Sequence, residues 1–270
     1  MYASAGINGI GIWELKLRAG GDADALEQLQ TSGLGSAAAV PAVPSILPLP
    51  LMEGPSDPQE RIESICASLH RLAPFQPSGI VCLTGPGDDR QTVVDGLRVI
   101  GDEAARAGVR LGLEPINHVG GEHWTMITTL SEAVELLEEA DRPALGLQFD
   151  SWHLWNTPDL VEEIERYVDR FVGVHIADWR EPPRGWADRV LPGDGVAGLP
   201  AILGALERAG WHGYYDLEIF SDNGTFGNAW PDSLWDVASE QLARAGREAF
   251  ERTWEARIRS PIDQVSPGAV

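Results

Sequence analysis

Residues 89–116 read DRQTVVDGLRVIGDEAARAGVRLGLEPI, and this stretch decides the fold class. Its first part, Asp89–Ala107, has a helical pattern and stops before Gly108, a residue type that ends helices in the left-handed conformation. The apolar run Arg110–Ile116 follows at once and predicts a strand covered on both faces. A helix that leads directly into such a strand is typical of a parallel α/β fold.

The same alternation of strands and helices runs through the whole chain. The other predicted strands are Gly9–Glu14, Ser36–Val43, Gly79–Gly85, Ala144–Asp150, Phe171–Asp178 and Gly213–Ile219. The other predicted helices are Asp24–Ser32, Pro58–Leu72, Ser131–Ala140, Pro158–Val168, Leu199–Ala209 and, approximately, Pro231–Arg257. Asp57 and Thr157 each precede a proline and are predicted helix caps, while Gly33 and Gly210 are predicted helix ends. Strictly alternating order requires crossover connections, so the sheet should be parallel.

Seven β/α units can be counted, whereas a closed barrel of this type has eight. Residues 2–6, YASAG, resemble the last turn of a helix with its terminal glycine, so we expect a (β/α)8-type TIM barrel whose first β/α unit is absent. Two unpaired strand edges would then face each other at the seam. A doubly wound open sheet is the alternative. The sequence predicts one domain over residues 1–260, followed by a tail at 261–270.

The composition narrows the classes of function. The 270 residues include 41 acidic and 20 basic side chains, a formal charge of −21, which disfavours nucleic acid as a partner. Cys66 and Cys82 are too few for a disulfide framework or a thiolate cluster. The N-terminus does not resemble a signal peptide, and no apolar run approaches the roughly 18 residues of a membrane helix. We therefore expect a cytoplasmic protein without a membrane partner.

Ionisable side chains stand where the last four predicted strands end. They are Glu114, Asp150, His175 and Glu218. The carboxyl ends of parallel strands share one face, so these groups should converge there. Taken singly, each would more often be a loop contact, a helix cap or a satisfied core histidine. Together, three carboxylates and an imidazole would repel and desolvate one another without a cation between them. Such a set of three oxygens and one nitrogen suits Mn²⁺ or Mg²⁺, with Co²⁺ and Zn²⁺ as alternatives.

Five short motifs in this chain resemble those of the xylose isomerase-like TIM barrels. They are LEPIN at 113–117, FDSWH at 149–153, VHIAD at 174–178, PGDG at 192–195 and LE at 217–218. That superfamily includes sugar isomerases and ketose 3-epimerases, and the resemblance covers essentially the whole chain. It implies that Glu114, Asp150, His175 and Glu218 are the metal ligands. In the family the ligands come from the last four strands, which also supports the absence of a first unit.

The resemblance implies a divalent-metal-dependent isomerase or epimerase of sugars or polyols, with Mn²⁺ as the expected cofactor. Glu218 would take a proton from the carbon next to a carbonyl, and Glu114 would return one to the resulting enediolate from the opposite face. His153 matches a histidine that contacts substrate oxygens, although it could instead orient Asp150.

Further substrate contacts are expected at Trp13, Asn117 and one of two arginines, Arg180 or Arg189, since the epimerases carry an arginine shortly after the metal histidine. Trp124 and Trp179 are weaker candidates for stacking on a sugar. The chain also departs from the epimerases, because Gly120 stands where they have a further glutamate. The identity of the substrate therefore does not follow from the resemblance.

Two other enzyme classes and one non-enzyme class share the same barrel. Dehydratases of keto-inositols and of dehydroshikimate begin with the same proton abstraction, so a metal-dependent lyase is the main alternative. The apurinic endonuclease branch needs more histidines, whereas the early strand ends here supply Glu14, Val43 and Gly85. A barrel that binds a sugar or metal without turnover is a further alternative. In each favoured case the expected partner is a small sugar or polyol. The sequence is also compatible with a homo-oligomer.

Overall fold

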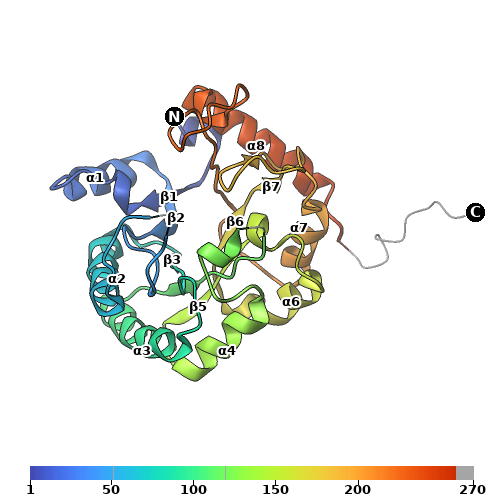
Figure 1. The fold of residues 1–270 in the computed structure, drawn as a ribbon. Coiled ribbons are helices and arrows are strands. Elements are labelled where there is room, and N and C mark those ends of the chain that lie inside the picture. Colours follow the sequence, from blue (N-terminus) through green and yellow to red (C-terminus); the bar gives the residue numbers. More distant parts are fainter. Residues whose placement is uncertain (51, 119, 260–270) are drawn as a thin grey trace, which may run out of the picture.

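The computed structural model describes residues 1–50, 52–118 and 120–259. Seen along its axis, the sheet lies inside a ring of helices that follows the chain order around the molecule (Figure 1). The predicted α/β barrel is therefore confirmed. The tail predicted at 261–270 lies outside the described residues.

Seven strands form one sheet within the described part of the chain, in sequential order. They are β1 (Gly9–Trp13), β2 (Gly35–Val40), β3 (Gly79–Cys82), β4 (Leu111–Leu113), β5 (Leu145–Asp150), β6 (Phe171–Ile176) and β9 (Asp216–Leu217). Each hydrogen-bonded pair of neighbours is parallel, as the alternation with helices predicts. A separate antiparallel pair, β7 (Asp178–Trp179) and β8 (Arg189–Val190), lies in the loop after β6.

The helices begin and end close to the predicted positions. They are α1 (Asp22–Ser32), α2 (Pro58–Leu72), α3 (Arg90–Ala107), α4 (Leu130–Ala140), α5 (Ser151–Leu154), α6 (Leu160–Tyr167), α7 (Leu199–Arg208) and α8 (Ser239–Glu255). Asp57 caps α2 by accepting a hydrogen bond from the backbone N–H of Gln59. Gly33 and Gly108 end α1 and α3 with φ of 73° and 71°, which confirms the two predicted helix ends.

Two predicted helix boundaries are wrong. Thr157 does not cap α6, because its hydroxyl accepts a hydrogen bond from the Asn117 amide and the helix begins only at Leu160. The predicted final helix from Pro231 is interrupted, because Val237 is extended and separates a short 3-10 turn from α8. The strands are also shorter than predicted, since apolar sequence continues past the last ladder hydrogen bonds.

Most of the core lies between the sheet and the helices. A separate, smaller group of apolar side chains from β1, β2 and β3 forms its own cluster. On the floor of the barrel, the Val172 side chain reaches toward three glycines, one on each of three neighbouring strands: Gly79, Gly112 and Gly146. A register shift opposite Gln148 adds one residue to β6, so Val172 and His175 both point inward although three positions separate them. This bulge places the histidine inside the barrel.

The seam between β1 and β9 is closed by side chains. No ladder between these two strands is found in the described residues. The Tyr214 side chain instead lies against Gly9 and Gly35, where added Cβ atoms would approach its ring to 2.7 Å and its hydroxyl to 1.9 Å. Asp216 likewise occupies the space above Gly11. The expected unpaired edges are thus shielded by one aromatic ring and one carboxylate.

We expect Gly35→Ala to destabilise the protein by about 1–3 kcal/mol, because the new methyl group overlaps the Tyr214 hydroxyl. Urea unfolding measures the change, and Gly185→Ala, whose Cβ would make an ordinary 3.5 Å contact, is the matched control. In the double variant with Tyr214→Ala, the two losses should be less than additive. Additive losses would contradict a direct contact at the seam.

A search of the described residues finds no helix that is both long and apolar enough to cross a membrane.

Candidate metal centre

Four side chains from neighbouring strand ends meet at the carboxyl face of the barrel. Glu114 follows β4, Asp150 ends β5, His175 lies in β6 and Glu218 follows β9. Asp150 also caps the short helix α5, accepting a hydrogen bond of 2.8 Å from the Trp152 backbone N–H. The rigid sheet therefore fixes the backbone positions of all four groups.

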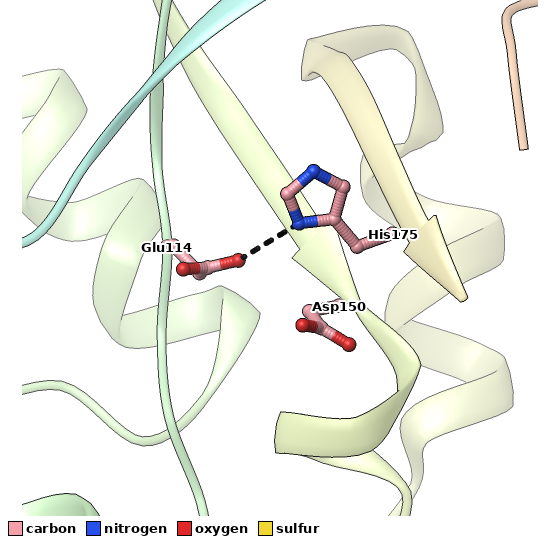
Figure 2. Close-up of side chains that lie close together, drawn as sticks. All are labelled: Glu114, Asp150 and His175. Atoms are coloured by element: carbon pink, nitrogen blue, oxygen red, sulfur yellow. Dashed lines mark ion pairs between the residues drawn. The ribbon is translucent and has the colours of Figure 1, made fainter. Parts of the chain in front are cut away.

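The distances between these groups suit one small cation. Ligand atoms of Glu114, Asp150 and His175 lie within 4.8 Å of one another, and all three residues are buried (Figure 2). The His175 Nδ1 atom is 3.8 Å from the Glu114 Oε1 atom and 3.5 Å from the Glu218 Oε2 atom. The convergence expected from the strand ends is thus present.

Arg189 is the cation that faces these carboxylates. Its guanidinium donates to Asp150 Oδ2 at 2.8 Å and lies 2.9 Å from Glu218 Oε2. The group is only 3 % exposed and lies over the Trp152 and Phe220 rings at 4.9 and 5.4 Å. A buried arginine in this place partly balances the negative charge of the site.

The electrostatic environment differs among the three acids. Burial raises the pKa of Glu114 well above its usual value, and the charges of Asp150 and Glu218 add to this rise. Burial also raises the pKa of Glu218, although His175 and Arg189 oppose it. Burial also acts to raise the pKa of Asp150. The charge of Arg189 opposes it most strongly, with smaller effects from His153 and His175, and holds this pKa below the usual range. A second cation would relieve the remaining repulsion.

Two buried ligand atoms support a metal in this place. Glu114 Oε1 and His175 Nδ1 are both shielded from solvent and have no hydrogen-bond partner in the described structure. Leaving such atoms unpaired costs free energy, and a coordinated ion would satisfy both. Carboxylate and imidazole donors are also the ligand types that divalent metals use in proteins. The residues therefore fit a divalent cation.

His153 lies beside this centre, as predicted. Its Nε2 atom is 3.5 Å from Asp150 Oδ2 and 3.4 Å from the Arg189 guanidinium. Burial, above all, lowers its pKa well below the usual value, so the ring is neutral at pH 7. The sequence analysis missed His118, whose ring stacks on His153 with centroids 5.1 Å apart. Its place directly after Asn117, in the loop beyond a ligand strand, is the signal that could have identified it.

The structure distinguishes between the two arginines predicted as substrate contacts. Arg189 contacts the centre, whereas Arg180 donates to Asp188 and Asp232 at 3.1 Å each. Arg184 binds the same two aspartates, which ties the β7–β8 hairpin to the loop after β9. Arg180 therefore acts in a loop network, and its assignment as a substrate contact is not favoured.

The remaining predicted contacts differ in their surroundings. The Asn117 side chain donates to Thr157 and so braces a loop. Trp13 is half-buried at the barrel mouth, where its ring meets Phe220 edge to face at 5.3 Å. Trp179 is buried against Trp152, 4.7 Å away between centroids, which makes packing its role.

An aromatic group covers the mouth beyond Trp13. Trp186, from the β7–β8 hairpin, lies 5.7 Å from Trp124, 5.7 Å from Phe220 and 4.6 Å from Phe226 between ring centroids. The long loop after β6 thus supplies both the buried Arg189 and the aromatic Trp186.

Curated relatives match part of this chain. A 3-dehydroshikimate dehydratase from Pseudomonas putida is 31% identical over 154 residues, 53% of this chain and 23% of that protein. An inosose dehydratase from Geobacillus thermodenitrificans and an inosose isomerase from Bacillus subtilis are each 29% identical, over 48% of this chain and 47% of their own length. The chain thus spans between about a quarter and about half of the length of these relatives.

Solved structures match over nearly the whole length. A crystal structure of a Sinorhizobium meliloti protein has a TM-score of 0.79 and 25% identity, covering 93% of both chains. The IolI protein, solved with a bound zinc atom, has a TM-score of 0.74 and 19% identity, covering 95% of this chain and 91% of its own, and shows a shared fold. A family model described as "Xylose isomerase-like TIM barrel" matches residues 37–253. The chain belongs to the xylose isomerase-like TIM barrel family.

Proposed function

We propose that this protein is a divalent-metal-dependent isomerase or epimerase of a sugar or polyol. The observation that carries the proposal is the convergence of Glu114, Asp150 and His175 within 4.8 Å, with Glu218 3.5 Å from the histidine. The names of relatives such as inosose isomerase support the reaction class. The proposed partner is a small polyhydroxylated carbonyl compound.

The four proposed ligands are Glu114, Asp150, His175 and Glu218, and Mn²⁺ is the proposed ion. When bound, such an ion polarises the substrate carbonyl and makes the neighbouring C–H more acidic. Glu218 is the proposed base, because burial raises its pKa and so makes its carboxylate a stronger proton acceptor. Glu114 is proposed to protonate the enediolate from the other face.

Three side chains are proposed to orient the substrate. Arg189 and the neutral His153 can hold hydroxyl or carbonyl oxygens beside the ligands, since both already lie next to Asp150. Trp13 can pack against the C–H face of a sugar ring at the mouth. Because these groups sit on three different elements, the substrate would be contacted from several sides.

A dehydratase is the second candidate, favoured by a specific comparison. A relative at 31% identity is named 3-dehydroshikimate dehydratase, and another is named inosose dehydratase. Dehydration begins with the same removal of a proton next to a carbonyl but then expels a hydroxyl group on the adjacent carbon. The four ligands serve both reactions, so the product distinguishes them.

The decisive test adds Mn²⁺ to the metal-stripped protein in D₂O with ketoses, aldoses and keto-inositols. We expect deuterium to enter next to the carbonyl of one substrate, and NMR detects its incorporation. A product isomeric with the substrate indicates an isomerase or epimerase, and a product lighter by water indicates a lyase. Tight metal binding without exchange in any substrate would contradict both and favour a barrel that binds its ligand without turnover.

A further inference from the structure

We propose that Asp216 is a positioning residue that holds the His175 ring so that its Nδ1 atom faces Glu114 and Glu218. The proposal rests on the proposed metal-dependent function, because it concerns how a ligand is oriented. Its basis is a second acid on the other side of the imidazole. The Asp216 Oδ2 atom lies 4.0 Å from the His175 Nε2 atom, at the limit of an ion pair.

The strand register brings these two residues together. His175 and Asp216 are direct partners in the parallel ladder between β6 and β9. Side chains alternate along extended backbone, so Asp216 on β9 and Glu218 directly after it both face His175. One acid is therefore level with the histidine, and the other lies one step nearer the mouth, where it faces Nδ1 at 3.5 Å. The two ring nitrogens thus face different carboxylates.

The opposite wall of the barrel leaves room for this carboxylate. Gly11 on β1 lies against Asp216, and a Cβ atom there would approach the Asp216 Oδ2 atom to 2.7 Å. Any larger residue at position 11 would push the carboxylate away from its place. The glycine and the aspartate thus form a matched pair across the seam, with the carboxylate only 18 % exposed.

A carboxylate beside the second nitrogen of a metal-binding histidine can orient the imidazole ring. A histidine that binds a metal through one nitrogen commonly directs its other N–H to a carboxylate, which fixes the ring and strengthens the ligand. His175 projects into the open end of the barrel, and its Nδ1 atom has no hydrogen-bond partner among the described residues. Asp216 supplies the missing restraint from the Nε2 side.

The test is calorimetric titration of Mn²⁺ and, separately, Zn²⁺ into metal-stripped wild-type protein, Asp216→Ala and Asp216→Asn. We expect Asp216→Ala to weaken metal binding about 10–100-fold, the usual effect of losing such a partner. Asp216→Asn should retain more affinity, because its amide oxygen can still face the ring N–H from the same place. The melting temperature of each metal-stripped variant separates this effect from lost stability.

Tyr214→Phe is the matched control, since Tyr214 packs at the same seam but faces Gly35. Its metal affinity should equal that of the wild type. If Asp216→Ala does not fold, Gly11→Ala decides, because its methyl group displaces the carboxylate and should also weaken binding. If folded Asp216→Ala binds metal as tightly as the wild type, the positioning role is overturned. Where Asp216→Ala does not fold, the same result in Gly11→Ala overturns it. A wild-type protein that binds neither metal overturns the proposed function itself.

Discussion

Glu218→Gln should abolish the exchange of substrate hydrogen with solvent, lowering its rate by about 10²–10⁴-fold. An amide cannot take up the proton, whereas the carboxylate it replaces lies in the buried centre 3.5 Å from His175 Nδ1. The rate of deuterium incorporation, monitored by NMR, measures the loss of exchange. Because Glu218 is also a proposed ligand, Mn²⁺ affinity has to be determined in parallel and the rates compared at saturating metal.

Glu114→Gln provides the informative comparison. If Glu114 only returns the proton, its variant should still exchange hydrogen on the face served by Glu218 while forming little product. Glu122→Gln is the control, because this exposed carboxylate is the nearest glutamate to the position where the epimerases have one. Full exchange in Glu218→Gln at saturating Mn²⁺ would rule out Glu218 as the base.

Arg189→Met should destabilise the metal-stripped protein by about 3–5 kcal/mol. The substitution preserves much of the side-chain volume but leaves Asp150, which is fully buried, without its cationic partner. Urea unfolding of the metal-stripped protein measures this loss. Saturating Mn²⁺ should restore part of the lost stability, since an ion bound at the same carboxylates replaces the missing charge.

The matched control is Arg244→Met, which removes an exposed ion pair with Glu240. Such pairs contribute about 0–1 kcal/mol, so the control should unfold almost as the wild type does. Arg189→Lys keeps the charge but only one donor group, and an intermediate stability is expected. An Arg189→Met protein as stable as the wild type without metal would show that Arg189 does not balance the site.

The positions of the proposed ligands could be predicted because they depend on a simple rule. Parallel strands end on one face, so Glu114, Asp150 and His175 could be brought together from their places in the chain alone. The number of strands followed from the same alternation of apolar runs and helices. Strand lengths were less predictable, because an apolar run does not show where ladder hydrogen bonds stop.

Other parts of the site depend on contacts that local sequence does not encode. The hairpin pairs Trp179 with Arg189, which brings a residue fourteen positions beyond His175 back to the centre, while Arg180 turns to Asp188. Antiparallel register within a long loop could not be read from spacing. His118 was missed for a similar reason, because its stacking on His153 joins the loop after β4 to the helix α5 after β5.

The extra residue in β6 also has a consequence for how this chain can vary. Phe171 packs outward among aromatic rings, and four steps separate it from His175, so without the bulge regular alternation would turn His175 toward the surrounding helices. Losing one residue at the bulge would leave three steps, as on the paired stretch of β5, so His175 would still face the interior. The inward place of the histidine therefore depends on the number and pairing of residues at the floor of the barrel as much as on the side chains at its rim.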